Sequence, residues 1–374
     1  MAISIGDRVV RMRAADGGAA VQVMAARETG DRFVLFNTAD GVRVPIRVDA
    51  MNTTGERGFL AITADDVVVP VRFDVDVIGF LFTGGAVSGG VTTRAYDPNG
   101  VQVWSANHGA AVLCIAADSD GMAFTGGGAA GDGNTVRAYN PDGSLAWSLA
   151  TSTAVQGIDC DDDYVYVADA TTAEKIKKYD KSGSFIWDAT PPSGVNPNCI
   201  AVDGSGNTFT GGITKNSKNI ITFDSSGTVV LNFTDGTFGV LDVFAELSGV
   251  FYAGGYSQAL KKYSAAGVLQ WTKAHGGQVQ GVAGNGTYVC IGGQSGTGSF
   301  TTRRYTVAGT LSWSKDNGAT VECIAMDAND SVYTGGLRAV SDTMTTRAYG
   351  TSGNLAWSVD HGDTVSGIAV RRGA

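Results

Sequence analysis

The sequence predicts an all-β protein: a seven-bladed β-propeller preceded by a small β-repeat domain of three hairpins. The main observation is a repeat, because the stretch Thr92–Trp104 (TTRAYDPNGVQVW) recurs in recognisable form seven times. Its aromatic residue advances in steps of 43, 40, 44, 40, 42 and 44 residues. Such a period with strand-like patterning is typical of propellers, in which each repeat forms one blade. The seven aromatic positions are Tyr96, Tyr139, Tyr179, Phe223, Tyr263, Tyr305 and Tyr349.

Composition is the second observation. The 374 residues include 53 glycines and only five glutamates, which favours short strands joined by many turns over helices. No stretch approaches the apolar run of about 18 residues that a membrane span needs. The start, MAISIGDRVV, lacks the basic and apolar regions of a secretory signal. Because the net charge is −9, we also expect no nucleic-acid partner, and we expect no membrane insertion.

One full repeat contains four predicted strands. They are Val112–Asp118, Gly121–Gly127, Thr135–Asn140 and Ser144–Ser148, and four short antiparallel strands make a propeller blade. The turn between the third and fourth strands, Asp97-Pro98-Asn99-Gly100 in the first copy, has the residues of a type I turn followed by a left-handed glycine. A tryptophan follows the turn glycine by four residues in six copies, and Leu231 replaces it in the fourth copy.

The two ends of the repeat region predict how the ring closes. The first copy begins with Phe80–Gly85, which corresponds to the second strand of a blade, and no first strand precedes it. The missing strand, Val365–Val370, stands near the C-terminus. We therefore expect the C-terminus to supply the innermost strand of blade one, which removes the open edges of the ring.

A shorter repeat predicts a separate N-terminal domain at 1–76, with the propeller at 77–374. Phe33–Asp49 and Phe59–Asp74 agree best, and each is patterned as strand, turn and strand. Pro45 and Pro70 cannot donate to a sheet, so each is expected at a sheet edge or a bulge.

This N-terminal domain is predicted to serve assembly. Lone hairpins are marginal in water, so three of them should pack together or pair with other chains. Residues 1–75 carry nine arginines and no lysine, which suits pairing with carboxylates across an interface. A plain β domain without a partner is the alternative. The predicted assembly residues are Arg8, Arg32, Arg47, Arg57 and Arg72.

The repeat pattern A/K-Y-D-x-x-G-x-x-x-W resembles that of PQQ-like (quinoprotein-type) propellers, whose tryptophan docks blade on blade. The run Ile200–Gly212 (IAVDGSGNTFTGG) is similar to NHL-type and related bacterial propeller repeats. The resemblance covers residues 77–374 and implies the propeller fold. Quinoprotein dehydrogenases would imply a larger, usually eight-bladed ring, a vicinal disulfide and calcium-ligating acids. Because this chain has no adjacent cysteines and too few blades, we carry over no cofactor.

Several polar repeat positions invite a chemical role, but each has a structural interpretation that we favour. His108, His275 and His361 share a position that other copies fill with Thr, Pro, Asp or Asn, as a turn between blades allows; metal or acid–base chemistry is the alternative. The acidic stretches at 118–120 and 161–163 fall in turns between first and second strands, with calcium as the alternative.

The cysteines also have a structural interpretation. Cys114, Cys199 and Cys323 share a position on the innermost strand, where small residues are needed near the axis, and a metal in the channel is the alternative. With an odd total of five and no CxxC pair, all cysteines are expected to be free thiols. We expect no metal and no cofactor.

A basic residue lies two positions before the repeat aromatic in six copies. Such a ring could bind an anionic ligand. Third strands lie far from the axis, however, and long basic stems commonly pack on neighbouring aromatic rings, so a structural role is favoured. The six residues are Arg94, Arg137, Lys177, Lys261, Arg303 and Arg347, and Ile221 is the exception.

The loop between the second and third strands varies in length, whereas the turn between the third and fourth does not. Variable loops on a rigid scaffold are where recognition usually resides, and all seven should emerge on one face. The predicted ligand-binding residues in these loops are Asp132, Asn134, Lys215, Tyr256, Gln294, Phe300, Arg338 and Asp342.

Together these features predict a non-enzymatic binding or structural protein. The N-terminal β module before a larger domain, the composition rich in Gly, Thr, Ala and Val, and the lack of a signal peptide resemble bacteriophage virion proteins of the tail or its fibres, made in the host cytoplasm. This resemblance implies docking to other virion proteins through the N-terminal domain, a homo-oligomer in the assembly, and binding of a host-surface glycan or protein.

Two other functions stay open. A propeller enzyme of the seven-bladed lyase or lactonase type would need clustered His, Glu or Asp at the channel mouth, and only three glutamates follow residue 76. An intracellular scaffold is the other alternative.

Overall fold

The computed structural model describes residues 80–371 except 89, 152–153, 170–174, 193–194, 214–218, 237–238 and 340–342. Before residue 80 it describes the backbone of strands β1 to β7. The chain divides into two compact units, Met1–Asp76 and Val77–Ala374. No helix in these described parts is long and apolar enough to cross a membrane.

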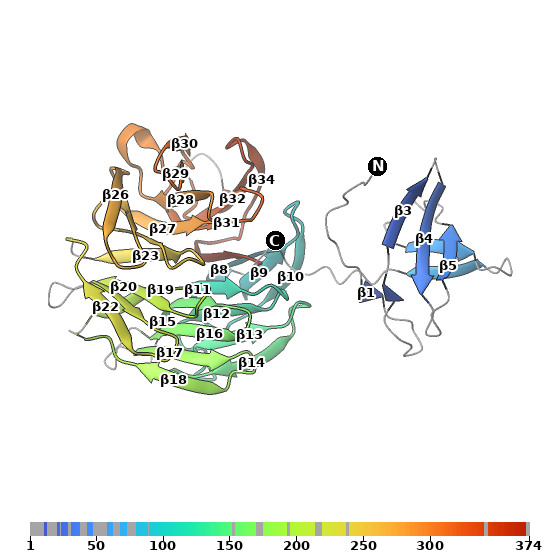
Figure 1. Cartoon of the computed structure of the whole chain (residues 1–374), viewed down its shortest axis with the longest axis horizontal. Coiled ribbons are helices and arrows are strands. Elements are labelled where there is room, and N and C mark those ends of the chain that lie inside the picture. The colour runs from blue at the N-terminus through green and yellow to red at the C-terminus, as the bar shows by residue number, and fades with distance from the viewer. Residues whose placement is uncertain are drawn as a thin grey trace. The chain divides into compact units, whose positions relative to one another are not determined.

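Seven antiparallel sheets of four strands form a ring, so the predicted seven-bladed propeller is confirmed (Figure 1). In blades two to seven the strands pair in chain order, because each tight turn brings the next strand alongside the last. Blade two has β11 (Val112–Ala117), β12 (Ala123–Gly127), β13 (Val136–Tyr139) and β14 (Leu145–Leu149). Blade three has β15 (Val155–Cys160), β16 (Tyr164–Asp169), β17 (Lys175–Asp180) and β18 (Phe185–Ala189). Blade four has β19 (Asn196–Val202), β20 (Thr208–Ile213), β21 (Ile220–Phe223) and β22 (Val229–Phe233).

The remaining blades repeat this arrangement. Blade five has β23 (Val240–Ala245), β24 (Phe251–Gly255), β25 (Ala259–Tyr263) and β26 (Leu269–Ala274). Blade six has β27 (Val279–Gly284), β28 (Tyr288–Gly293), β29 (Thr302–Thr306) and β30 (Leu311–Lys315), with the short 3-10 helix η2 (Thr297–Ser299) before β29. Blade seven has β31 (Val321–Met326), β32 (Val332–Gly336), β33 (Thr346–Tyr349) and β34 (Leu355–Val359).

Blade one is completed by the C-terminal strand, as predicted. β35 (Val365–Val370) pairs antiparallel with β8 (Leu81–Ser88), which is followed by β9 (Val91–Tyr96) and β10 (Gln102–Ala106). Val365 is fully buried, and its Cγ1 fills the space beside Gly335 of blade seven. The last strand therefore completes one blade and packs against the previous one. Figure 1 shows the C-terminus close to β8.

Glycines at the end of the second strand let neighbouring blades approach closely. A Cβ added to Gly126 would lie 2.5 Å from Cγ1 of Val155, which starts the first strand of the next blade. Likewise, a Cβ added to Gly292 would lie 2.3 Å from Cγ1 of Val321 in the next blade. Because interiors are close-packed, any larger residue here would push two blades apart. The repeated T-G-G stretches are thus packing positions between blades.

The repeat tryptophans join each blade to the next. Trp104 donates its Nε1–H to the carbonyl of Pro141, 3.1 Å away in the following blade. Its ring covers Gly143, which has a φ of +86° and where a Cβ would lie 2.7 Å from the indole, so conformation and space both require glycine. Equivalent bonds run from Trp147 to Lys181, Trp187 to Ser225, Trp271 to Val307 and Trp357 to Pro98.

The N-terminal unit is built from repeated hairpins. β4 (Asp31–Asn37) pairs with β5 (Arg43–Arg47), and β6 (Gly58–Ile62) pairs with β7 (Val68–Arg72). Their registers are equivalent, since Leu35 faces Pro45 in one and Leu60 faces Pro70 in the other. Among the described strands, β5 and β7 each pair on one side only, so both prolines lie on edge strands as predicted.

The rest of this unit follows the same plan. β1 (Arg11–Met12) pairs with β2 (Val21–Gln22), and β3 (Met24–Glu28) adds a third strand beside β4. Of the predicted assembly residues, Arg32 lies on β4, Arg47 on β5 and Arg72 on β7. Arg8 and Arg57 lie outside the described residues.

Candidate functional site

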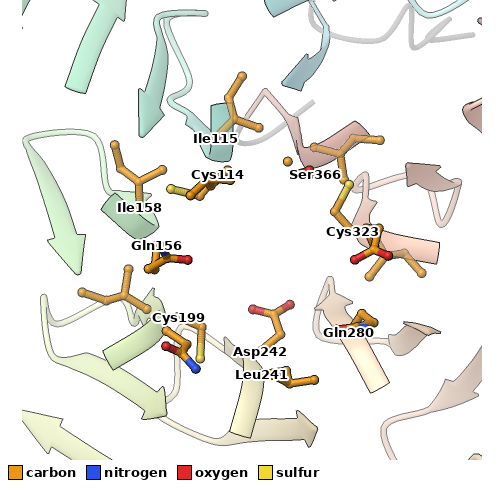
Figure 2. Close-up of a pocket in the computed structure, with 18 residues that line it drawn as sticks. Cys114, Ile115, Gln156, Ile158, Cys199, Leu241, Asp242, Gln280, Cys323 and Ser366 are labelled. Atoms are coloured by element: carbon orange, nitrogen blue, oxygen red, sulfur yellow. The ribbon is translucent and has the colours of Figure 1, made fainter. Parts of the chain in front are cut away.

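A cavity of about 430 Å³ lies at the axis of the ring, where the innermost strands of all seven blades converge. Amide side chains contribute much of its polar wall, from Gln156, Asn198 and Gln280. Two carboxyl groups, those of Asp242 and Glu322, complete it. Figure 2 shows the Asp242 carboxylate directed into this space from β23, so the axial cavity offers hydrogen-bonding groups to water or a small polar ligand.

Burial controls the protonation of this lining. It raises the pKa of Asp242 to about 7, while its Oδ2 accepts the N–H of Val282 at 2.7 Å. Burial also raises the pKa of the thiols of Cys114, Cys199 and Cys323, so they stay protonated at neutral pH and act as small apolar side chains. All five cysteines are free thiols, as predicted.

The acidic stretches form turns. Asp118 Oδ1 accepts the N–H of Met122, and Asp161 Oδ1 accepts the N–H groups of Asp163 and Tyr164. These bonds fix the connections between first and second strands, which is the structural interpretation favoured from the sequence. Within the described residues, no group of three or more His, Cys, Asp or Glu side chains is placed to hold a metal ion.

The three histidines lie in the connections between blades, as predicted, but they are fully buried there. His108 donates its backbone N–H to Thr92 of its own blade at 2.7 Å, and its Nδ1 lies 2.9 Å from Oγ1 of Thr125 in the next blade. His361 makes the same two contacts, with Thr345 at 2.8 Å and Thr83 at 3.1 Å. These side chains therefore bridge neighbouring blades.

Asn317 shows that an amide can fill the same position. Its N–H donates to Thr301 at 2.9 Å, and its Nδ2 donates to Thr334 of blade seven at 2.8 Å. His275 differs, since its backbone N–H donates to the Gln258 carbonyl and its Nε2 lies 2.9 Å from the Gln294 carbonyl. The repeat position of the three histidines therefore links neighbouring blades, and either an imidazole or an amide side chain can form the link.

We predict that these histidines make the fold sensitive to acid. Burial and, to a lesser extent, a neighbouring arginine together lower the pKa of His108, His275 and His361 to about 4 each. The unfolded chain binds protons below about pH 6.5 while the folded histidines stay neutral, so stability falls between about pH 6.5 and pH 4. Each histidine should cost about 3 kcal/mol of unfolding free energy by pH 4. Chemical denaturation over this pH range measures the loss.

The matched control is the double variant His108→Asn and His361→Asn, which introduces the residue type that Asn317 supplies at the same position of the repeat. We expect it to fold and to lose part of the acid sensitivity. The raised pKa of Asp242 acts in the opposite direction, adding stability as pH falls through about 7, and it is common to both proteins. An identical pH dependence in variant and parent would show that the histidines do not cause it.

Three of the basic residues before the repeat aromatics pair with acids, whereas Arg303 donates to the carbonyl of Ala274 and also lies over the ring of Phe300, the kind of contact expected from the sequence. Arg137 pairs with Asp132 at 2.7 Å, and Lys177 pairs with Asp169 at 2.8 Å. Lys261 pairs with Asp235 at 3.3 Å. The structural role predicted for these positions therefore holds for these four residues.

Two repeat positions vary together, a signal in the sequence that was missed when each position was interpreted alone. Each buried histidine has an arginine at the basic position of the next blade, and the charge of Arg137, Arg303 or Arg94 lowers the histidine pKa. Where the histidine position holds Asp235, Lys261 pairs with it. Where it holds Pro191, the basic position is Ile221.

The predicted ligand-binding residues that the structure describes lie in loops at one end of the ring, because second strands all end there in an antiparallel blade. Asp132 and Asn134 bond within their own blade, to Arg137 and to Ser148. Arg338 pairs with Asp360 at 2.7 Å. Tyr256 and Gln294 are exposed, and Phe300 is half-buried beside Arg303. Lys215 and Asp342 lie outside the described residues.

These features define a seven-bladed β-propeller with a polar axial cavity and with tryptophan and histidine bridges between blades. No family model matches the chain, and a search of curated proteins finds no match. The likeness to PQQ-like and NHL-type repeats therefore rests on the motifs quoted above.

Proposed function

We propose that the protein is a non-enzymatic structural and binding component of a bacteriophage virion, belonging to the tail or its fibres. In this proposal the N-terminal domain, 1–76, docks to other virion proteins and brings copies of the chain together. The propeller, 77–374, is presented to bind a glycan or protein of the host surface. The likeness to PQQ-like and NHL-type repeats belongs to the proposal only as a likeness of fold, without their activities.

The observation that carries the proposal is the contrast between the two units. The propeller pairs its last strand with β8, so its ring needs no partner to cover the edge of that strand. The described strands of the N-terminal unit form sheets of two and three strands, and such small sheets are marginal alone and gain most from packing with other subunits. This contrast favours a protein whose copies assemble through the N-terminal unit and whose propeller is left free to bind a ligand.

The loop end of the propeller supports a role in binding. Leu337 and Tyr256 are each 42 % exposed in these loops, and the charged Arg338 directly follows Leu337. Exposed aromatic and apolar side chains among polar groups are typical of recognition surfaces. The loops also differ in length from blade to blade, while the turns between third and fourth strands keep one length.

We predict that the N-terminal arginines hold the assembly together. Arg47 and Arg72 occupy equivalent register positions, opposite Phe33 and Gly58. Guanidinium groups bond carboxylates with two parallel hydrogen bonds, which lysine cannot do. The triple variant Arg32→Gln, Arg47→Gln, Arg72→Gln of the full chain should therefore dissociate, as measured by multi-angle light scattering.

Lysine at the same three positions is the matched control, because it keeps the charge. We expect it to weaken assembly less than glutamine does. An unchanged mass for the glutamine variant would contradict the role given to these arginines.

A further inference from the structure

A second cavity, of about 690 Å³, opens between blades three and four at the end of the ring opposite the variable loops. We call it the Lys178 groove. The turns at 161–163 and 203–206 line it together with Tyr164, Tyr166 and Lys178. Ser225, Ile186 and Leu247 complete the lining. None of the ligand-binding residues predicted from the sequence lies in this groove.

The ammonium group of Lys178 is the unusual feature of this groove. Lys178 is only 5 % exposed, and among the described residues no group forms a hydrogen bond or ion pair with its Nζ. The Nζ lies 3.8 Å from the ring centroid of Tyr164 and 5.1 Å from that of Tyr166. Because no protein acceptor takes them, the three N–H donors of this ammonium group are available to a ligand in the groove.

The same repeat position in other blades shows what such a side chain ordinarily does. Lys262 donates to the carbonyl of Val307 in the next blade at 3.0 Å. Arg304 donates to the carbonyls of Asp330 and Thr351, at 2.8 and 2.7 Å. The Val307 carbonyl also accepts the Nε1–H of Trp271, whereas the corresponding carbonyl of the Lys178 groove, that of Ser225, accepts the Nε1–H of Trp187 without a bond from Lys178. Lys178 is therefore the exception among three equivalent basic residues.

The charges around Lys178 restrict what can bind. Asp161, Asp162, Asp163 and Asp203 line the same groove, so an anion would be repelled, while a cation could not accept hydrogen bonds from the ammonium group. Asp203 Oδ1 is held by the N–H groups of Ser205 and Asn207, and Asp161 Oδ2 by the Tyr166 hydroxyl. A neutral ligand that both donates and accepts hydrogen bonds fits these groups best.

Adjacent sugar hydroxyls have this property. One hydroxyl oxygen can accept from Lys178 while a neighbouring O–H donates to Asp163, which is exposed on the turn. Ile186 and Leu247, which are 46 % and 74 % exposed, offer apolar contact to the C–H face of a sugar ring. The cavity volume also falls within the range of about 300–1,000 Å³ that is usual for small-ligand sites.

We propose that the Lys178 groove binds a neutral carbohydrate, with Lys178 and Asp163 bonded to its hydroxyl groups. This inference rests on the proposed function, in which the propeller binds the host surface, and it names the class of ligand. It also places the site at the end of the ring opposite the loops that vary in length.

The test compares two equivalent lysines. The full chain is screened on an array of neutral glycans built from glucose, galactose, mannose and N-acetylglucosamine, and the best binder is titrated by calorimetry. Lys178→Met keeps the apolar stem and removes the ammonium group, so affinity should fall at least about tenfold while the melting temperature is unchanged or higher. Lys262→Met is the control, which should lower the melting temperature and leave affinity within about twofold.

Three outcomes would overturn the inference: no neutral glycan bound by the parent chain, equal affinity in the parent and Lys178→Met, or tighter binding of acidic sugars such as glucuronate. The two proposals can fail separately. A chain that assembles but binds no glycan contradicts only the groove, whereas a monomer that binds glycan through Lys178 contradicts only the assembly role.

Discussion

Deletion of residues 365–374 is expected to abolish cooperative unfolding of the propeller and to cause aggregation. The deletion removes β35, whose Val365, Ile368 and Ala369 are all buried. It also leaves the edge of β8 unpaired and takes away the bond from the Arg371 N–H to the Phe80 carbonyl. Unpaired strand edges pair with other chains, so the truncated protein should associate through β8. Thermal unfolding and light scattering measure both effects.

The control is deletion of residues 372–374 alone, which leaves β35 intact. The protein that lacks only residues 372–374 should have a melting temperature close to that of the parent protein. A protein lacking 365–374 that unfolds in one transition at the parent temperature would contradict the role of β35 in closing the ring.

Trp104→Ala is expected to cost about 3–5 kcal/mol of unfolding free energy, as other large core truncations do. Trp104 is 8 % exposed. The centroid of its ring lies 5.8 Å from the ring centroid of Phe82 in its own blade and 5.8 Å from that of Tyr139 in the next blade. The substitution also leaves the Pro141 carbonyl without the indole N–H. Denaturant titration at neutral pH measures the change.

Trp313→Ala is the matched comparison, because the Nε1 of Trp313 is buried without a hydrogen-bond partner. Its loss should therefore be smaller by about 1 kcal/mol, the usual net contribution of one hydrogen bond. Losses below about 1 kcal/mol at both positions would mean that the tryptophans do not join the blades.

The blade count and the ring closure could be predicted from the sequence, because both depend on local patterns. The turn between third and fourth strands needs a left-handed residue, so Gly100 and Gly143 mark it in the first two copies of the repeat, with φ of +81° and +86°. The first copy lacks one strand and the C-terminus supplies it, so Val365–Val370 could be assigned to blade one without a structure.

The contacts between blades were harder to predict, because they join residues whose spacing the repeat does not display. His361 and Thr83 are 278 residues apart, yet they bridge blades seven and one. Lys178 could not be distinguished from Lys262 by sequence, since both precede a repeat tyrosine. In both blades the tryptophan bonds the turn carbonyl of the next blade, and the two lysines differ because Lys262 bonds that carbonyl as well and Lys178 does not.

The central claim is that the N-terminal domain holds copies of the chain together and that the propeller is free to bind the host surface. Comparing the mass in solution of the 374-residue chain with that of residues 77–374 tests this claim. Both are measured by multi-angle light scattering at one concentration. We expect the propeller alone to have the mass of a single copy, and the full chain to have the mass of a defined multiple. A full chain with the mass of one copy that also fails to bind purified virions would contradict the account.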